Sequence, residues 1–444
     1  MNPRPSYLSP AEAFGRLRLI APANLLALGK RIREKVFHVN TTNSHCVEAM
    51  YGSYNLVFVL QLDKTRMVIR VPACGKSGSL TGPAERWLKS NVQTLKYITA
   101  NTTIPVPKVY DFDTTADNEI AAPYTAMSFI EGHTVGEIWF RRSGPTSREE
   151  RRQRILQQLA RFMVQLSLLS FDRIGSLSPD PNGGGDVSVG PSFDFGWTNQ
   201  GDMTINETGP IVSSRDWMRC FWASPYTLHP GPGGVIHPGP EGRRDSYFNR
   251  GTIQLLKTIG KMIPEQTSHF SLAPPDLDYY NVMADERGII TGIIDWDNTQ
   301  TVPDFLGCLR YPAWILWDRF DDDPRPDVGT AEGRARELPR NQAYYLEQVT
   351  EALVARGRGA EAQYTKNSEF YESFWLAFIN VQWRFGVCRT LVERVKGFLL
   401  LEGDPIPDAF RKDFIRILEN LGGDRLSSVD KDTLKRALRA EMDF

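Results

Sequence analysis

The stretch Pro274-Pro-Asp-Leu-Asp-Tyr-Tyr-Asn-Val-Met-Ala-Asp-Glu-Arg-Gly-Ile-Ile-Thr-Gly-Ile-Ile-Asp-Trp-Asp297 decides which fold we expect. Two short apolar runs, residues 281–284 and 289–294, flank a polar turn that ends in a glycine, and this pattern predicts a β-hairpin. The hairpin brings Asn281, at the start of one strand, close to Asp295, at the end of the other. Asp276 precedes them on a loop beside the same end. We therefore expect three oxygen-bearing side chains to converge there.

This set of side chains suits phosphoryl transfer. Magnesium prefers oxygen ligands and takes only one or two from the protein when phosphates supply the rest, and Asn281 and Asp295 can provide them. Asp276 precedes Asn281 by five positions, the spacing of the base and the metal-binding asparagine in kinase catalytic loops. The alternative is a polar turn in which Asp and Asn cap the backbone.

The chain upstream of this stretch predicts a small α+β lobe. Residues 55–62 and 67–71 are β-rich runs around the polar turn 63–65, which indicates a hairpin. Residues 84–100 have apolar residues at helical spacing, and residues 123–130 form a further strand. Two features suit a phosphate grip: the glycine turn Tyr51-Gly-Ser-Tyr-Asn55 offers backbone N–H groups, and Arg70 offers a fork of donors. Taken alone, these are a β-turn and a strand arginine.

Helices dominate the rest of the chain. Ser147 precedes Glu150 by three positions, the spacing of a capping box. Residues 177–250 are rich in Gly, Pro and Asp, and we expect a long irregular insertion in which His229 and His237 are solvated. The largely apolar pattern of residues 369–400 predicts one long helix. Residues 407–442 are expected to form further amphipathic helices. We expect an N-terminal helical extension (1–45), a nucleotide-binding N-lobe (46–130) and a helical C-lobe with the catalytic loop (131–444).

Composition limits the partners and the location. The 444 residues carry 52 basic and 53 acidic side chains, a net charge of −1, so we expect neither nucleic acid nor a membrane as partner. The five cysteines are scattered without a CxxC pair and predict free thiols in a reducing compartment. We expect a cytoplasmic protein. A mitochondrial transit peptide is the alternative for the basic stretch 14–35, although Glu34 favours an ordinary surface helix. Nothing in the sequence indicates the oligomeric state.

Several motifs together resemble the aminoglycoside phosphotransferase and choline kinase-like family, most closely its fungal branch. Over residues 46–320 they are Gly52-Ser-Tyr-Asn55, Val68-Ile-Arg-Val-Pro72, Ile104-Pro-Val-Pro107, Phe171…Ile174-Gly-Ser-Leu177, Asp276-Leu277…Asn281 and Gly292-Ile-Ile-Asp-Trp296. The resemblance implies a protein-kinase-like bilobal α+β fold with an antiparallel-sheet N-lobe and a mainly helical C-lobe. It also implies ATP as donor and magnesium as cofactor.

The resemblance assigns roles to particular residues. Asp276 matches the catalytic base, and Asn281 and Asp295 match the metal ligands. Arg70 takes the position of the phosphate-binding lysine, on the strand beside the glycine turn. The nucleotide would further contact the glycine turn and the hinge whose backbone holds adenine, at Gly52, Ser53, Asn55, Ser128 and Ile130.

Two family positions are replaced. Pro274 stands where the family usually has a histidine two residues before the base. Asn91 stands where a helix glutamate usually pairs with the basic strand residue; it can hydrogen-bond Arg70 but cannot neutralise it. Two hypotheses follow. The first is a kinase that phosphorylates the hydroxyl of a small metabolite, and the second is a pseudokinase that binds a nucleotide or a partner without transfer.

Acidic and aromatic residues after the hairpin are candidates for acceptor binding. Their character suits an amine-bearing acceptor. They are Asp297, Asp304, Trp314, Trp317 and Asp318.

Overall fold

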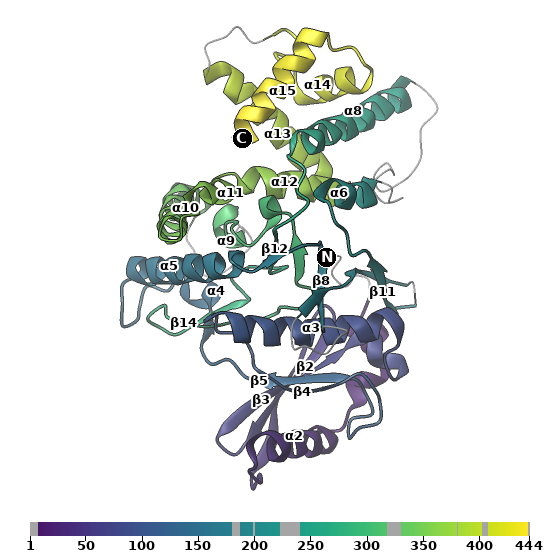
Figure 1. Ribbon diagram of the computed structural model, residues 1–444, viewed down its shortest axis with the longest axis vertical. Coiled ribbons are helices and arrows are strands. Elements are labelled where there is room, and N and C mark those ends of the chain that lie inside the picture. Colours follow the sequence, from purple (N-terminus) through teal and green to yellow (C-terminus); the bar gives the residue numbers. More distant parts are fainter. Residues whose placement is uncertain are drawn as a thin grey trace.

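The computed structural model describes residues 8–179, 187–198, 200–222, 240–317, 330–379, 381–401 and 407–442. It shows the expected kinase-like bilobal α+β fold. A five-stranded sheet forms the small lobe at one end, and the helices gather toward the other (Figure 1). Within these ranges no helix is long and apolar enough to cross a bilayer.

The small lobe is built on an antiparallel sheet with the order β1-β2-β3-β5-β4. Its strands are β1 (Ser44–Tyr51), β2 (Asn55–Leu62), β3 (Thr65–Pro72), β4 (Val109–Asp113) and β5 (Tyr124–Ser128). The predicted hairpin is confirmed, because β2 and β3 pair from Asn55–Pro72 to Leu62–Thr65. Asp63 turns the chain with φ 51°, a conformation that Asp tolerates better than most residues. Residues 52–54 connect β1 to β2, so the glycine turn is the loop of the first hairpin.

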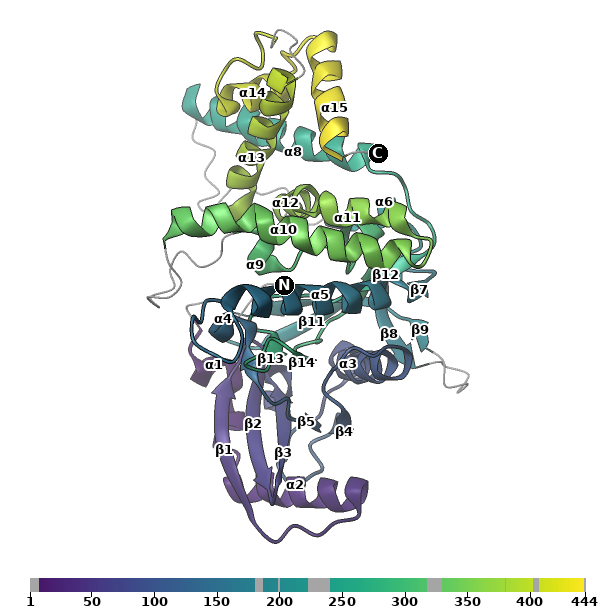
Figure 2. The same cartoon turned by 90° about the vertical axis from the view of Figure 1, so that its left-hand side faces the viewer.

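Helices cover the small lobe. They are α1 (Pro10–Phe14), the 3-10 turns η1 (Gly15–Leu19) and η2 (Ala73–Ser77), α2 (Pro22–Phe37) and α3 (Gly82–Asn101). Figure 2 shows α2 lying across the ends of the strands. The stretch that we expected to be a surface helix is therefore partly buried: Leu28 and Ile32 are fully buried, and a Cβ on Gly29 would lie 2.8 Å from Leu60 Cδ1.

The large lobe contains short sheets and many helices. The expected catalytic hairpin is present as β13 (Val282–Ala284) and β14 (Ile290–Ile293), with Gly288 at φ 81°, and a short strand β6 joins it. A second sheet has the order β7-β12-β15-β8-β9. The remaining strands are β6 (His133–Thr134), β7 (Ser170–Phe171), β8 (Gly175–Pro179), β9 (Val187–Val189), β12 (Phe270–Ala273) and β15 (Gln300–Val302).

The first helices of the large lobe are α4 and α5. The capping box predicted at Ser147 and Glu150 is confirmed at the start of α5. The long helix expected at 369–400 is two helices, α12 and α13. The elements are α4 (Val135–Ile138), α5 (Arg148–Ser167), η3 (Asp304–Leu306), α9 (Ala313–Leu316), α10 (Ala331–Val354), η4 (Gly359–Glu361), α11 (Ala362–Lys366), α12 (Ser368–Ile379), α13 (Val381–Leu401), α14 (Phe414–Gly422) and α15 (Ser428–Met442).

The expectation of an irregular insertion at 177–250 is wrong for its described part. Besides β8 and β9 it contains the hairpin β10 (Ser192–Trp197) and β11 (Met203–Thr208), α6 (Ser214–Trp222) and the start of α8 (Pro240–Met262). Phe193 and Phe195 alternate with polar residues on β10 and are buried in the cluster around the small-lobe sheet. That alternation is a strand signal hidden by the surrounding glycines. His229 and His237 lie outside the described residues.

This packing bears on the predicted domain boundaries. The buried cluster around the small-lobe sheet also contains Phe14 and Leu28 from the N-terminal helices and Met203 from β11. Residues before 46 and after 190 therefore contribute to the small-lobe core, while the boundaries at 45 and 130 stay a prediction.

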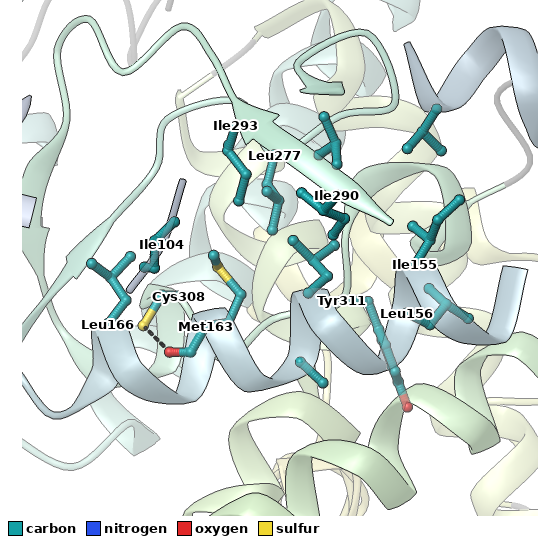
Figure 3. Close-up of a cluster of buried hydrophobic side chains, with 14 of the residues drawn as sticks. Ile104, Ile155, Leu156, Met163, Leu166, Leu277, Ile290, Ile293, Cys308 and Tyr311 are labelled. Atoms are coloured by element: carbon teal, nitrogen blue, oxygen red, sulfur yellow. Dashed lines mark hydrogen bonds between the residues drawn. The ribbon is translucent and has the colours of Figure 1, made fainter. Parts of the chain in front are cut away.

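A hydrophobic core anchors the β13–β14 hairpin. Figure 3 shows Leu277, Ile290 and Ile293 on the side that faces helix α5, from which Met163 projects toward them. Cys308 Sγ donates to the carbonyl oxygen of Met163 at 3.4 Å. Leu277 directly follows Asp276 and is 3% exposed, and burying such a side chain stabilises the fold by about 1.5–3 kcal/mol. The loop that carries Asp276 is thus held by its next residue.

Candidate functional site

The loop between β12 and β13 places Asp276 and Asn281 in direct contact. Asn281 Nδ2 donates to the Asp276 carbonyl oxygen at 3.0 Å and to Asp276 Oδ2 at 3.2 Å. Asp276 is exposed, and Oδ2 is the carboxylate oxygen that accepts from Asn281. Since the amide nitrogen of Asn281 faces Asp276, its Oδ1 is the atom left for a ligand.

The β13–β14 hairpin places Asp295 beside Asn281. Val282 pairs with Ile293, and Ile294 N donates to Asn281 O at 2.8 Å, so Asp295 follows directly across the ladder. Asp295 has φ 60° and an exposed side chain. Trp296 is 2% exposed and donates from Nε1 to Ile293 O at 2.8 Å, which fixes the chain on the far side of Asp295. The three predicted residues are brought to one end of the hairpin.

Arg70 lies opposite this loop and contacts two of its carboxylates. Its Nη2 donates to Asp295 Oδ1 at 2.9 Å, and its Nη1 donates to Asp297 Oδ1 at 3.0 Å. A third contact joins Nη2 to Asp297 Oδ2 at 2.9 Å. Burial acts to lower the pKa of Arg70, but the charges of Asp297 and Asp295 outweigh it and raise the pKa. Burial raises the pKa of Asp297, against the effect of Arg70.

The glycine turn adds one side-chain contact to this cluster. Asn55 Nδ2 donates to Asp297 Oδ2 at 3.0 Å, while Gly52 N donates to Asn55 O at 2.9 Å and closes the turn. Ser53 is exposed at its tip. Tyr54 packs on Phe195 of β10 with ring centroids 4.9 Å apart. The turn is therefore supported by the β10–β11 hairpin.

Asn91 does not take the role that its position suggested. Its Oδ1 accepts a hydrogen bond from the backbone N–H of Asn298 at 2.9 Å, and the charged partners of Arg70 are Asp295 and Asp297. Asn91, Arg70 and Asp297 all line one small cavity beneath α3. Helix α3 thus holds the loop that carries the carboxylates instead of supplying one.

The expected hinge joins β5 to the large lobe. Ser128 N donates to Lys108 O at 2.9 Å, and Ser128 Oγ accepts from Lys108 N at 2.9 Å. The backbone N–H and the hydroxyl of Ser128 are therefore engaged by Lys108 within the small lobe. The backbone groups after Ser128 are the ones that could contact an adenine base. Ile130 packs on the hairpin, where a Cβ on Gly292 would lie 2.6 Å from Ile130 Cγ2.

Arg310 supports the loop at the position of the missing histidine. Its Nη2 donates to the Pro274 carbonyl oxygen at 2.6 Å, and its Nη1 contacts Glu372 Oε1 at 2.6 Å. Burial acts to lower the pKa of Arg310, but Glu372 and, more weakly, Asp276 raise it. Nothing in the sequence around Arg310 distinguishes it from a surface arginine.

The expected acceptor residues that the structure describes lie in different surroundings. Asp297 faces Arg70, and Trp314 is 2% exposed in the core. Asp304 accepts from Ser271 Oγ and lines a separate cavity with His269 and Arg358, and burial raises its pKa. Trp317 is half-buried against the core, and Asp318 lies outside the described residues. The amine-bearing acceptor therefore stays a prediction.

The donor set of the loop fits magnesium. Two oxygen ligands, Asp295 and Asn281, lie at the hairpin end, which is the number expected when phosphates and waters complete the shell. In the described ranges no cluster of three or more His, Cys, Asp or Glu side chains could hold a metal by itself. Both the two oxygen ligands and the lack of a larger cluster agree with a metal site that is completed by the phosphates of a bound nucleotide.

Comparison with known proteins finds a match to one phosphotransferase family model and to fungal proteins. Residues 51–186 match the model of the Phosphotransferase enzyme family. A subtelomeric hrmA-associated cluster protein of Aspergillus fumigatus is 29% identical over 317 residues, which cover 60% of this chain and 60% of that protein. The mitochondrial protein named Altered inheritance of mitochondria protein 9 of Zygosaccharomyces rouxii is 26% identical, over 64% of this chain and 45% of that protein. The chain is therefore similar, over residues 51–186, to the family that the motifs resemble.

Among solved structures, the chain is similar to a Ralstonia eutropha protein described as an aminoglycoside phosphotransferase. The identity is 14% and the TM-score is 0.46, over 90% of this chain and 97% of that one. The chain spans about 60% of the length of the first curated relatives that it matches.

Proposed function

We propose that this chain, a member of the aminoglycoside phosphotransferase and choline kinase-like family, transfers the γ-phosphoryl group of ATP to a hydroxyl of a small molecule. The observation that carries the proposal is the meeting of Arg70, from the small lobe, with the carboxylate loop beside Asp276 and Asn281. A basic strand residue facing a metal-binding loop is the arrangement that phosphoryl transfer requires.

Each residue has a task in this proposal. Asp276 receives the proton of the acceptor hydroxyl on its free Oδ1, while Asn281 fixes the other carboxylate oxygen. The acceptor oxygen forms a bond to the γ-phosphorus as the bond from phosphorus to the β–γ bridging oxygen breaks, and ADP leaves. Arg70 holds the α and β phosphates, with Gly52, Ser53 and Asn55 in the turn over them. The backbone of the hinge after Ser128, including Ile130, holds adenine.

Asn281 and Asp295 would hold magnesium. When bound, the ion would neutralise charge on the β and γ phosphates and keep them in line with the acceptor. Asp295 is suited to this because it is the more exposed of the two carboxylates at Arg70: 47% of its side chain is exposed, against 18% for Asp297.

The test is formation of a phosphorylated product with Mg-ATP across a panel of amine-bearing and neutral alcohols, detected by mass spectrometry. General-base catalysis contributes about 10²–10⁴-fold, so D276N should lower the rate at least 100-fold and leave ATP affinity within twofold. Glu286→Gln, in the exposed turn of the hairpin, is the matched control and should match the wild type. Equal product from wild type and D276N on every substrate would refute the proposal.

A nucleotide- or partner-binding module without transfer is the second candidate. Pro274 in place of the histidine before the base favours it. Both candidates predict that Mg-ATP raises the melting temperature in proportion to the logarithm of its concentration, but only the first predicts product.

A further inference from the structure

We propose that Asp297 is a positioning residue that orients Arg70 toward the nucleotide from the opposite lobe, the task that the family gives to an acidic residue on the helix after the hairpin. The inference rests on the proposed function and goes further, because it assigns a role to a carboxylate outside the catalytic set. It also makes the grip on the phosphates depend on contact between the lobes.

The contact between Asp297 and Arg70 is a two-pronged one. Nη1 reaches Oδ1 at 3.0 Å and Nη2 reaches Oδ2 at 2.9 Å. Paired N–H···O contacts of this kind fix the plane of a guanidinium as well as its charge. The side chains are 14% and 18% exposed, so solvent and salt screen the pair less than they would a surface pair.

Three side chains of the small lobe contact residues 297 and 298. Arg70 and Asn55 bind the Asp297 carboxylate, and Asn91 Oδ1 accepts from Asn298 N at 2.9 Å. Asn298 has φ 62°, a turn in the chain that Asn accommodates. The helix position that lacks an acid therefore holds the backbone next to the acid that replaces it.

Asp295 and Asp297 contact Arg70 in different ways. Asp295 makes one contact through Oδ1 and is nearly half exposed, whereas both oxygens of Asp297 are engaged, one by Arg70 alone and the other by Arg70 and Asn55. Asp295 can therefore turn to a metal while Arg70 keeps a charged partner. The occupied oxygens also argue against Asp297 as a metal ligand.

The experiment relocates the charge. The affinity for AMP-PNP with magnesium is measured by calorimetry for the wild type, D297N, N91D and D297N/N91D. We expect D297N to bind about tenfold more weakly, since a contact with a charged partner is replaced by one with a neutral partner. N91D keeps the acceptor for Asn298 N and adds a carboxylate to the cavity shared with Arg70. It should restore affinity in the D297N background to within about threefold of the wild type.

Controls separate the possible failures. Asp172→Asn removes a carboxylate that is 77% exposed and should leave affinity unchanged. If D297N binds AMP-PNP as tightly as the wild type, the inference is overturned and the proposed function stands. The same holds if the double variant D297N/N91D binds AMP-PNP as weakly as D297N. If the wild type does not bind AMP-PNP, the proposed function fails. The pair is then tested without nucleotide, because melting temperatures of R70Q, D297N and R70Q/D297N should be strongly non-additive if the two side chains are coupled. Should D297N not fold, D297E must bind AMP-PNP within tenfold of the wild type, and complete loss would overturn the inference.

Discussion

Replacing Arg310 by methionine should separate the support of the catalytic loop from the chemistry of Asp276. Arg310 links two parts of the large lobe, because it donates to the Pro274 carbonyl oxygen and contacts Glu372 on α12, each at 2.6 Å. Methionine fills much of the same space without charge. The substitution therefore removes both contacts and leaves Glu372, whose side chain is 12% exposed, without its cation.

The size of the effect follows from that burial. Breaking a buried ion pair by removing one partner costs about 3–5 kcal/mol, and we take the lower end because Arg310 and Glu372 are not fully buried. About 3 kcal/mol is roughly a 100-fold change in the folding equilibrium. The double variant R310M/E372Q carries no unpaired charge, so it should recover most of this stability, since a pair replaced as a whole is often close to neutral.

The two variants should differ in stability and agree in activity. Guanidinium unfolding followed by tryptophan fluorescence should show a lower midpoint for R310M and a midpoint near the wild type for R310M/E372Q. Both should lose about 10–100-fold in kcat with little change in the KM for ATP, because the loop that carries Asp276 is displaced and misplacement by about 1 Å has costs of that size. A double variant with wild-type kcat would refute the argument that Arg310 positions the loop.

Three further changes test other parts of the fold. Gly251→Ala should lower the free energy of unfolding by at least about 1–3 kcal/mol, because its Cβ would lie 1.8 Å from the Leu418 carbonyl oxygen and force α8 away from α14. Gly386→Ala in α13 is the control, because nothing lies within 4 Å of the new Cβ, and it should raise the free energy of unfolding by about 0.5–1 kcal/mol. Equal changes in the free energy of unfolding for the two variants in denaturant titrations would contradict the close packing of α8 on α14. Burial acts to raise the pKa of Asp111, but Tyr124, Lys35 and Arg31 outweigh it and lower the pKa, so this carboxylate contributes stability above its unfolded pKa of about 3.9 that is lost as the pH falls through the lower folded value. Asp111→Asn should therefore be less stable than the wild type at pH 7 and approach it on acidification below about pH 4, whereas a difference that persists at low pH in melting scans would count against the linkage. Phe195→Ala removes the ring that packs on Tyr54 and Trp87, and should cost about 3–5 kcal/mol of stability and weaken the binding of AMP-PNP; lower stability with unchanged affinity would show that β10 does not support the glycine turn.

The parts of the fold that the sequence predicted are those set by neighbouring residues. The hairpin around Gly288 and the hairpin around Asp63 each follow from a turn between two apolar runs, and both are present. The capping box at Ser147 likewise depends on residues three positions apart. Such patterns are decided within one element, where periodicity and turn chemistry act.

The parts that the sequence did not predict depend on contacts between distant segments. The β10 strand packs on the small lobe although it follows α5 in the sequence. Its alternating pattern of aromatic and polar residues is short, and the glycines around it make the pattern hard to recognise as a strand. Arg310 reaches Pro274 across 36 residues. No local pattern indicates which carbonyl a buried arginine will contact, because that is fixed only when the helices of the large lobe pack.

Asn91 shows why a missing family residue is weak evidence for a lost activity. Considered alone, an amide in place of the helix acid predicts that the charge of Arg70 is not neutralised, and hence that Arg70 is poorly oriented to bind phosphate. In the folded chain two carboxylates lie within 3.0 Å of Arg70, brought from 225 and 227 residues away. A charge requirement is met by any acid that reaches the same space, since the Coulomb interaction depends on distance and environment and not on the element that carries the charge. The pseudokinase hypothesis therefore loses the argument based on Asn91 and retains only the one based on Pro274, whose carbonyl Arg310 already holds. Product formation by the wild type tests whether transfer occurs, and R310M/E372Q tests whether transfer depends on that contact.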